Sequence, residues 1–272
     1  MQPSRPRPVH PEGKIHGVAA CEAVFRARPD DIVRGYFSEA VAKRFGPLMR
    51  FLAQRRRAYH IVGEDELERV AETKHHGGVC LLVRRRSALT VEAWLARLGG
   101  SDACLLALEG VGNPHNLGAI LRSAAHFGAK AVLSTDPALL QSGAAARVAE
   151  GGAEAVALLE ADSLAAGLKA LRAAGFKVLA TSSHQGESVF ATALPKRCVI
   201  LLGEEQHGLS AQALRDADLT VRIPGSGAVE SLNVSVAAAI LLAEYWRQNA
   251  APAARLPGKL TLGKRPPRRS DR

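Results

Sequence analysis

The fold is decided by the stretch Asn113-Pro-His-Asn-Leu-Gly-Ala-Ile-Leu-Arg-Ser-Ala-Ala-His-Phe-Gly128, which follows the apolar segment 104–108. The apolar segment predicts a buried strand. Apolar residues at helical spacing then predict a helix over 116–127. Arg122 is the only formal charge in the quoted stretch. Because Arg is seldom buried without a partner, this lone guanidinium indicates either a salt bridge to a carboxylate at the sheet edge or a functional role.

Beyond this stretch, short apolar segments alternate with helical ones. This alternation predicts a mainly parallel sheet that is covered by helices on both faces. The expected strands are 104–108, 131–134, 155–158, 177–181, 198–202 and 219–222. The expected helices are 116–127, 143–149, 163–174 and 231–247.

The front of the chain predicts a small α/β domain over residues 13–86. Helices are expected at 14–25, at 39–53 with an interruption near Gly46-Pro47, and at 64–71, and strands at 33–37, 59–62 and 79–83. Residues 87–103, with an amphipathic helix over 90–98, are expected to link the domains. Residues 1–12 and 251–272 are rich in Pro and basic residues without apolar periodicity, which predicts disorder at both ends.

Composition and charge narrow the class of protein. The 272 residues are 47% hydrophobic, enough for a substantial core. Residues 1–100 contain 18 Lys and Arg against 11 Asp and Glu, residues 101–250 contain 11 against 14, and residues 251–272 contain 7 against 1, so the three parts carry +7, −3 and +6. A slightly acidic central part between basic flanks favours a catalytic unit with nucleic-acid-binding surroundings, although basic charge can also serve solubility alone.

The four cysteines, at positions 21, 80, 104 and 198, show no C-x-x-C pairing. We therefore expect reduced thiols, no metal site and a cytoplasmic protein. No apolar run approaches the ~20 residues that span a membrane, and the polar start of the chain is unlike a secretory signal. We expect no membrane partner.

Two later segments complete a pattern of three motifs. They are Cys198-Val-Ile-Leu-Leu-Gly-Glu-Glu-Gln-His-Gly-Leu-Ser210 and Arg222-Ile-Pro-Gly-Ser-Gly-Ala-Val-Glu-Ser-Leu-Asn-Val-Ser-Val236. Taken in order, N-x-G-x-x-x-R, G-x-E-x-x-G-L-S and I-P…S-L-N-V-S resemble the motifs of the SpoU (TrmH) RNA ribose methyltransferases of the SPOUT superfamily, over residues 104–248. Lys74-His-His-Gly-Gly-Val79 also resembles the H-x-G-x-V/I signature of the ribosomal-protein-like substrate-binding domain that often precedes them.

The resemblance implies a catalytic domain over 104–250 with a trefoil knot, formed by Leu201–Gly208 and Arg222–Asn233. It also implies S-adenosylmethionine as cofactor, tRNA or rRNA as partner, methylation of a ribose 2′-hydroxyl and a homodimer. The apolar helix that ends at Trp246, hydrophobic almost all round, supports the dimer independently.

The resemblance also implies the site residues. The matching catalytic positions are Arg122, Asn116, Glu205, Ser231 and Asn233. The matching cofactor-binding positions are Thr181, Leu202, Gly203, Ile223 and Leu232.

These positions also have plain structural readings, which stay open at this point. Asn116 can simply cap a helix, as can Ser231, and Glu205 can simply begin one. The pKa of a guanidinium exceeds ~12, so Arg122 is expected to clamp a phosphate and stabilise a developing alkoxide rather than act as a free base. Two departures are Asn113, where the family often has Asp, and Glu204, where it has a small residue.

Two other functions are compatible with parts of the sequence. Gly110-Val-Gly112 follows a strand, as in dinucleotide-binding folds, but His115 stands where G-x-G-x-x-G needs its third glycine. A non-catalytic RNA-binding or ribosome-assembly factor on the same fold is a stronger alternative, although Asn116, Arg122, Glu205 and Asn233 are all present.

Overall fold

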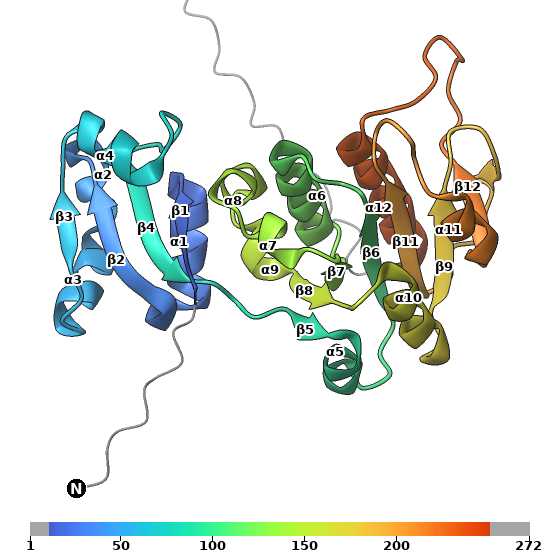
Figure 1. Ribbon diagram of the computed structural model, residues 1–272, viewed down its shortest axis with the longest axis horizontal. Helices are drawn as coiled ribbons and strands as arrows, with labels where there is room; N and C mark the ends of the chain where they lie inside the picture. Colours follow the sequence, from blue (N-terminus) through green and yellow to red (C-terminus); the bar gives the residue numbers. More distant parts are fainter. Residues whose placement is uncertain (1–10, 251–272) are drawn as a thin grey trace, which may run out of the picture.

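The computed structural model describes residues 11–250 and builds them around two separate sheets (Figure 1). The predicted disorder of residues 1–12 and 251–272 falls mostly outside the described residues, but it is wrong for Glu12, which begins a strand and pairs with Arg84. Among helices within residues 11–250, none is long and apolar enough to cross a membrane.

The small domain is built on a four-stranded sheet with the order β1-β4-β2-β3. Its strands are β1 (Glu12–His16), β2 (Ile32–Phe37), β3 (Tyr59–Ile61) and β4 (Val79–Arg84). Its helices are α1 (Val18–Ala27), α2 (Glu39–Ala42), α3 (Gly46–Gln54) and α4 (Glu64–Ala71), with a 3-10 turn η1 (Pro29–Asp31). The strands and helices predicted over 33–83 are confirmed, including the interruption before Gly46.

The predicted helix start at Lys14 is wrong. Residues 12–16 form strand β1, which pairs antiparallel with β4. Gly17, with φ 90°, turns the chain into α1, which begins at Val18. A left-handed φ favours glycine, so Gly17 marks this boundary. Pairing with a distant strand outweighed the local helical pattern.

The core of the small domain lies mainly between its sheet and helices α1 to α3, where Val24, Leu48 and Leu52 pack against Phe37 and Leu81. A smaller cluster on the opposite face joins Leu67 and Ala71 of α4 to Cys80 of β4. Helix α4 contacts β4 and β1, and so covers only one half of that face.

The large domain is built on an eight-stranded sheet with the order β10-β12-β9-β11-β6-β7-β8-β5. All neighbouring strands pair in parallel, which confirms the predicted parallel sheet. The strands are β5 (Leu89–Thr90), β6 (Ala103–Glu109), β7 (Ala131–Leu133), β8 (Ala157–Glu160), β9 (Lys177–Thr181), β10 (Glu187–Ser188), β11 (Arg197–Gly203) and β12 (Leu219–Arg222).

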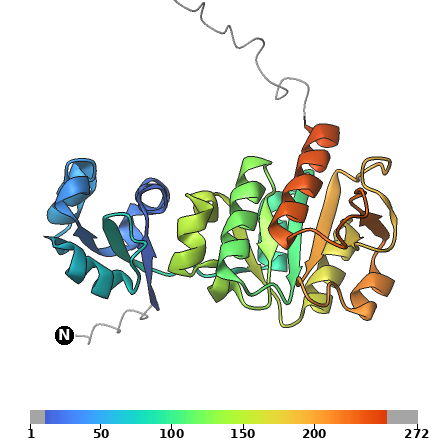
Figure 2. The ribbon, with the colours of Figure 1, turned by 90° about the horizontal axis from the view of Figure 1, so that it is seen from above.

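Helices cover both faces of the large sheet, as Figure 2 shows from above. The helices are α5 (Val91–Leu98), α6 (Pro114–His126), α7 (Pro137–Leu140), α8 (Gly143–Ala149), α9 (Gly152–Ala155), α10 (Leu164–Ala173), α11 (Ala211–Asp216) and α12 (Val234–Asn249). Alternate residues of β6 serve the two faces: Leu106 packs in the cluster that includes α6 and α12, and Leu105 packs with α5 and α10. Burial on both faces explains why β6 is apolar without alternation.

The predicted linker is in part a folded piece of the large domain. Within 87–103, strand β5 pairs with β8 at the edge of the large sheet. Helix α5 confirms the helix predicted over 90–98, and the Thr90 side chain caps it by accepting a hydrogen bond from the Ala93 amide. Trp94 is 6% exposed and its ring lies 6.0 Å from that of Phe176. The large sheet therefore begins well before residue 104.

The order of strands reverses beside β6, and we use the word crevice for the carboxyl edge of the sheet at this reversal. The chain runs outward from β6 through β7 to β8 and later returns on the other side of β6 as β11. Glu109 at the end of β6 lies opposite Gly203 at the end of β11. Open α/β sheets bind ligands at such a reversal, beyond the carboxyl ends of the strands. The expected knot stays a prediction, but both of its segments leave strands at this carboxyl edge.

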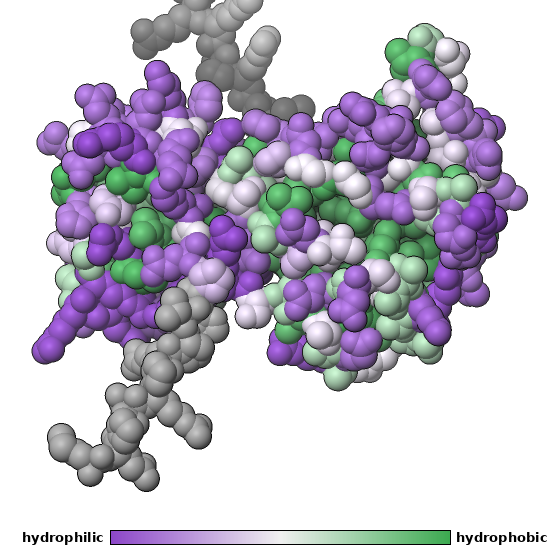
Figure 3. Space-filling view, in the orientation of Figure 1, coloured by the Kyte–Doolittle hydropathy of each residue, from purple (hydrophilic) through white to green (hydrophobic). Residues whose placement is uncertain are grey.

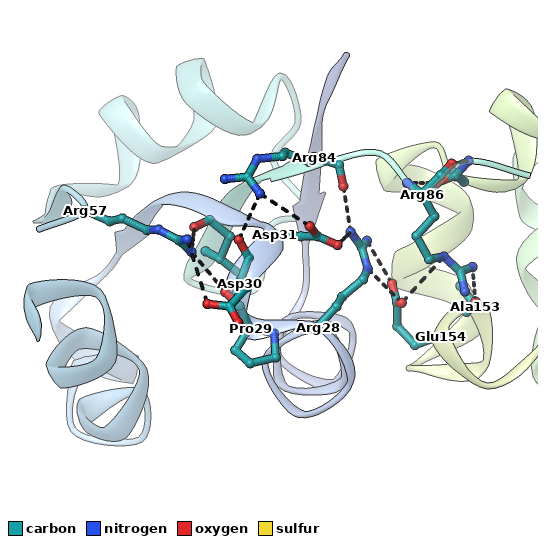
Figure 4. Close-up of polar contacts among 11 residues, drawn as sticks. Arg28, Pro29, Asp30, Asp31, Arg57, Arg84, Arg86, Ala153 and Glu154 are labelled. Carbon is teal, nitrogen blue, oxygen red and sulfur yellow. Dashed lines mark hydrogen bonds and ion pairs between the residues drawn. The ribbon is translucent and has the colours of Figure 1, made fainter. Parts of the chain in front are cut away.

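The two domains dock through charged residues that Figure 4 shows between α1, β4 and α9. Arg28 donates from Nε and Nη2 to the two carboxylate oxygens of Glu154, at 2.9 and 3.1 Å. Arg86 lies 3.7 Å from the same carboxylate and donates to the carbonyl of Ala153. The side chains of Arg28, Glu154 and Arg86 are only 12%, 9% and 22% exposed. We call these three residues the docking cluster.

Apolar and glycine contacts extend the docking surface. Ala146 of α8 belongs to the core of the small domain. A Cβ at Gly143 would lie 2.7 Å from the carbonyl oxygen of Lys14 and 2.9 Å from the ring of His16. Only glycine permits so close an approach, and the small domain thus sits directly on α8 and α9.

Candidate active site

Three polar side chains meet at the carboxyl edge of the large sheet. Asn116 donates from Nδ2 to Oε1 of Glu205 at 2.9 Å, and Asn233 donates to Oδ1 of Asn116 at 3.0 Å. Asn233 also donates to Oε1 of Glu205. Each residue comes from one of the three motif segments. The structure therefore brings together residues that lie 89 and 117 positions apart, and we call them the amide–carboxylate network.

Asn233 joins this network to the start of α12. Its Oδ1 accepts hydrogen bonds from the backbone amides of Ser235 and Val236, so Asn233 is the N-cap. The predicted cap at Ser231 is wrong, and the helix begins at Val234 rather than 231. Asn caps as well as Ser does, and here its amide nitrogen remains available to bind Glu205. Ser231 lies exposed, two residues before the cap.

The start of α6 differs from the prediction in the same way. Asn113 is the N-cap, and its Oδ1 accepts from the amides of His115 and Asn116. Pro114 at the first helical position fits this arrangement, since its missing amide hydrogen would have no helical partner. Asn116 is therefore not the cap, and its 9% exposed side chain serves the network instead. Asn113 performs the capping that an Asp would, so this departure from the family pattern preserves the helix start.

The loop after β11 folds back on the strand. Glu204 and Gly208 form an isolated β-bridge, and a Cβ at Gly203 would overlap the backbone of Gly208. Glu109 secures the far side of this loop, because its carboxylate accepts hydrogen bonds from the Ser210 amide and hydroxyl at 2.9 and 2.8 Å. The loop thus presents backbone to the crevice. Sequence reasoning assigned no role to Glu109, although its place at a strand end was a usable signal.

The predicted cofactor-binding residues all lie at or beyond this edge. Leu202 and Gly203 end β11, and Leu202 is 1% exposed. Thr181 ends β9, and its hydroxyl donates to the carbonyl of Leu201 at 2.9 Å. Ile223 follows β12 and packs against the core. Leu232 is 44% exposed and lies one residue before Asn233, the cap of α12. Their roles in binding stay a prediction.

Arg122 lies on the same helix as Asn116 but not in the network. Its Nη2 lies 2.8 Å from Oε2 of Glu150, and the two side chains are 57% and 50% exposed. The Asn116 side chain contacts Glu205 and Asn233, and within residues 11–250 no hydrogen bond joins it to Arg122. The alternative reading of a carboxylate partner is correct, although the carboxylate sits at the end of α8 and not at the sheet edge.

The turn that carries Arg122 packs tightly against α9. A Cβ at Gly152 would lie 2.9 Å from the Cα of Arg122 and 2.8 Å from the carbonyl of Leu121. The two helices therefore meet backbone to backbone. Glu150, which the sequence analysis did not single out, has the left-handed φ of 45° and ends α8 just before this contact. A single sequence carried no signal for it.

Glu204, the other departure, faces the exposed side of the loop. His207 Nδ1 lies 2.6 Å from Oε1 of Glu204, and both side chains are largely exposed. The Glu204 carboxylate thus contacts a side chain of its own loop. Across residues 11–250, no group of three or more His, Cys, Asp or Glu side chains is placed to hold a metal ion.

Comparison with known proteins fits this geometry. Residues 103–243 match the SpoU rRNA methylase family, and residues 14–88 match the family of RNA 2′-O ribose methyltransferase substrate-binding domains. The sequence is 48% identical over 240 residues to a protein of Escherichia coli O157:H7 named "uncharacterized tRNA/rRNA methyltransferase YfiF", covering 88% of this chain and 69% of the relative. It is 36% identical over 248 residues to the 23S rRNA (guanosine-2′-O-)-methyltransferase RlmB of Burkholderia sp, covering 86% and 96%.

Solved structures agree on the fold. A crystal structure of an RNA 2′-O ribose methyltransferase aligns with a TM-score of 0.67 at 27% identity, over 88% of this chain and 89% of the other. An rRNA methyltransferase from Sinorhizobium meliloti aligns with a TM-score of 0.71 at 24% identity, over 88% of each chain, which supports the fold alone. Because the first family match covers just over half of the chain and the RlmB relative is spanned almost completely, this chain belongs to the SpoU family of RNA methyltransferases.

Proposed function

We propose that this enzyme transfers a methyl group from S-adenosylmethionine to a ribose 2′-hydroxyl of rRNA or tRNA. The observation that carries the proposal is the amide–carboxylate network. Asn116, Glu205 and Asn233 come from three distant segments and meet where the carboxyl ends of β6 and β11 open into a crevice. If these three residues only stabilised the fold, they would not need to meet at the edge of the sheet where open α/β folds bind ligands.

The residues around the crevice fit the cofactor. S-adenosylmethionine supplies an electrophilic methyl group when it is bound. The glycine-rich return of the loop at Gly203 leaves backbone groups to recognise the adenosine, and the exposed Leu232, with Ile223, offers an apolar cover for it. Leu202 and Thr181 complete this set at the neighbouring strand ends.

Arg122 is the proposed catalytic residue. A guanidinium keeps its proton at neutral pH, so its role is to clamp a phosphate beside the reacting ribose and to stabilise negative charge as it develops on the 2′-oxygen. Its pairing with Glu150 does not oppose this role. An ion pair that is about half exposed is worth only about 0 to 1 kcal/mol, and an RNA phosphate can replace the carboxylate.

Around Arg122, the proposed roles of Asn116, Glu205, Asn233 and Ser231 are to shape the site. The first three hold a fixed arrangement through mutual hydrogen bonds, with Oε1 of Glu205 shared between the two amides. Ser231 lies exposed before the α12 cap, within reach of solvent and of an incoming RNA. These residues position the reacting groups, and Arg122 stabilises the negative charge that develops on the 2′-oxygen.

We also propose a homodimer. Val229, Leu232 and Val236, which lead into or lie on α12, are 72%, 44% and 47% exposed. Exposed apolar residues gathered beside a site indicate a covering surface, and a second copy of the chain would bring its own α12 to that place. Sedimentation of a fully active monomer at micromolar concentration would contradict this.

The RNA partner and the compartment follow from the charges and the thiols. The basic surplus of residues 1–100 suits a polyanion, and the relatives carry names of tRNA and rRNA methyltransferases. Cys21, Cys80, Cys104 and Cys198 are free and buried. Reduced thiols and an RNA substrate together fit the cytoplasm.

The experiment is a methyl-transfer assay with radiolabelled S-adenosylmethionine on total RNA from a strain that lacks the gene, followed by mapping of ribose methylation. The wild-type protein should label one RNA class, and Asn116→Ala should not. A protein that binds this RNA without transferring label would instead favour the non-catalytic RNA-binding factor.

Cofactor placement has its own test. Replacing the exposed Leu232 by Arg puts a charge against the proposed adenosine pocket while disturbing little of the core. We expect binding of S-adenosylmethionine, measured by calorimetry, to fall below detection with an unchanged melting temperature. Leu139→Arg is the matched control, because Leu139 is a similarly exposed leucine on α7, outside the proposed pocket and dimer surface. Unchanged affinity in Leu232→Arg would move the cofactor elsewhere.

A further inference from the structure

The small domain carries an aromatic pair at the margin of the α4 cluster, beside the exposed edge strand β3. Tyr36 of β2 lies opposite His60 of β3 in the parallel register, so both side chains project from the same face. Their rings stack with centroids 5.2 Å apart and an angle of 23° between planes. Tyr36 is half-buried against the α4 cluster, and His60 is exposed. The outer face of the His60 ring is therefore open to solvent.

A cation adjoins this pair. Arg34 lies two residues before Tyr36 on β2, hence on the same face, and donates from Nη1 to the Tyr36 hydroxyl at 3.3 Å. The Arg34 side chain is exposed, and no salt bridge joins it to a carboxylate within residues 11–250, although Glu12 lies close enough to be felt electrostatically. The stretch Arg55-Arg56-Arg57 leads into β3 at the same end of the strand.

The pair also sits at an open edge. β3 is the last strand of the four-stranded sheet, all three of its residues are exposed, and Figure 1 shows it on the side of the small domain turned away from the large sheet. Figure 3 shows that hydrophilic residues crowd this domain, with apolar patches among them. Arg55 and Arg57 pair with Asp30, so Arg34 is the guanidinium beside the stacked rings that has no salt bridge within residues 11–250. An exposed stacked pair beside such a cation lacks a purpose within the fold itself.

We infer that His60, Tyr36 and Arg34 form a stacking site for an unpaired nucleotide of the RNA substrate. A base extends the existing stack on the outer face of His60, and Arg34 contacts the adjoining phosphate. Aromatic rings beside a basic groove bind single-stranded nucleic acid in this way, because every base has a face that stacks. This inference rests on the proposed RNA substrate and adds that the small domain recognises an unpaired part of it.

The docking cluster fixes the position of the stacking site relative to the large domain. Since Arg28, Glu154 and Arg86 hold the small domain on α9, the stacking site stands at a fixed position relative to the carboxyl edge of the large sheet. An RNA that places a loop base on His60 would thus have another of its riboses directed toward the crevice. The site sets which nucleotide is presented, and Arg122 acts on it.

The test uses the full chain and a 12-nucleotide single-stranded RNA with 2-aminopurine at its centre, together with the duplex of the same sequence. His60→Ala should weaken binding of the single strand by about tenfold, the loss expected for one base stack, and should abolish the fluorescence quenching. Binding of the duplex should not change. Arg34→Ala should lower the dependence of binding on salt by about one phosphate contact.

Tyr59→Ala is the matched control, because Tyr59 is a 40% exposed aromatic residue on the same strand but on the opposite face. It should leave single-strand affinity and quenching intact. Equal affinity of His60→Ala and wild type, or equal losses for single strand and duplex, would overturn the inference, as would a change in oligomeric state alone. Failure of the wild-type protein to transfer methyl groups would refute the proposed function but leave the stacking result unaffected.

Discussion

The amide–carboxylate network and the docking cluster are both built on a glutamate, but they use it differently. Glu154 of the docking cluster binds with both carboxylate oxygens to Arg28, and its side chain is 9% exposed. Glu205 uses Oε1 for both Asn116 and Asn233, and within the described part of the chain its Oε2 has no hydrogen-bond partner.

The difference separates a structural contact from a site. In the docking cluster every strong donor and acceptor is satisfied within the protein, and Arg28 even donates to the carbonyl of Arg84 at 2.6 Å. Burial lowers the pKa of the Arg86 guanidinium, and the neighbouring Glu154 carboxylate offsets part of that effect. Such a group is costly to disturb and has nothing left to offer a ligand. The network at the crevice keeps unused bonding capacity where a ligand arrives.

The largest effect is expected for Arg122, which belongs neither to the amide–carboxylate network nor to the docking cluster. Arg122→Ala should lower the single-turnover rate of methyl transfer by about 10² to 10³, typical of one lost electrostatic stabiliser. Arg122→Lys should recover little, because lysine lacks the planar fork of donors. Cofactor affinity and stability should hardly change, since the pair with Glu150 is exposed.

Glu150→Gln is the control for that experiment, because it breaks the same ion pair but keeps the guanidinium. Its rate should stay near that of wild type. A near wild-type rate in Arg122→Ala would remove this residue from the mechanism.

The next effect breaks the docking cluster. Glu154→Gln leaves Arg86 without a counter-charge and Arg28 with only Asp31, whose Oδ2 lies 3.4 Å from Nη1 of Arg28. Loss of one partner of a buried pair costs about 3 kcal/mol. We expect a lower urea midpoint for release of the small domain, followed by limited proteolysis between residues 84 and 90. Glu22→Gln, which breaks the exposed pair with Arg44 inside the small domain, should have little effect. Equal effects of the two variants would contradict the special status of the docking cluster.

A smaller effect separates the two roles of Asn233. Asn233→Ala removes the cap of α12 and should cost about 1 kcal/mol of unfolding free energy. Asn233→Ser keeps a capping oxygen but loses the amide that binds Glu205, so stability should recover while methyl transfer stays low. Thermal melting and the transfer assay on the same preparations measure the two roles. Recovery of activity in the serine variant would reduce Asn233 to a cap.

The smallest effect concerns pH and the docking surface. Burial lowers the pKa of His16, and the positive charge of Arg147 lowers it further; the nearby His75 and His76 also face it. The folded protein therefore takes up this proton less readily than the unfolded chain, whose histidine has a pKa of ~6.5. Stability from this residue should be constant above that value and should fall as the pH drops below it. In His16→Gln, the urea midpoint should fall less between pH 7 and pH 5 than it does in the wild type. An equal fall in both proteins would show that His16 does not contribute to this pH dependence.

How far the sequence predicts the molecule can be judged from its elements. The parallel sheet and the convergence of three motifs were predictable, because apolar strands buried on both faces and residues at strand ends leave local marks. Strand β1 was not, since its pairing with β4 is a contact between distant residues. The caps at Asn113 and Asn233 were displaced by two or three residues, because Asn116 and Ser231 are equally good caps by type.

The ion-pair partners of the arginines were the hardest feature to predict from the sequence. Glu154 and Glu150 sit in an alanine- and glycine-rich stretch that carries no motif, yet they bind Arg28 and Arg122. Which arginine a glutamate meets depends on how two domains pack, and neither periodicity nor spacing reports that. For the same reason, the stacked pair of Tyr36 and His60 was visible only once β2 and β3 were aligned.

Helix α9 contains only four residues, Gly152–Ala155, but it contacts both the small domain and helix α6. Its Glu154 holds the small domain, and its Gly152 lies directly against the turn of α6 that carries Arg122, with no side chain between the backbones. Helix α9 therefore connects the small domain to the turn of α6 that carries Arg122. Movement of the small domain on binding RNA would therefore act directly on the backbone of Arg122, the proposed catalytic residue.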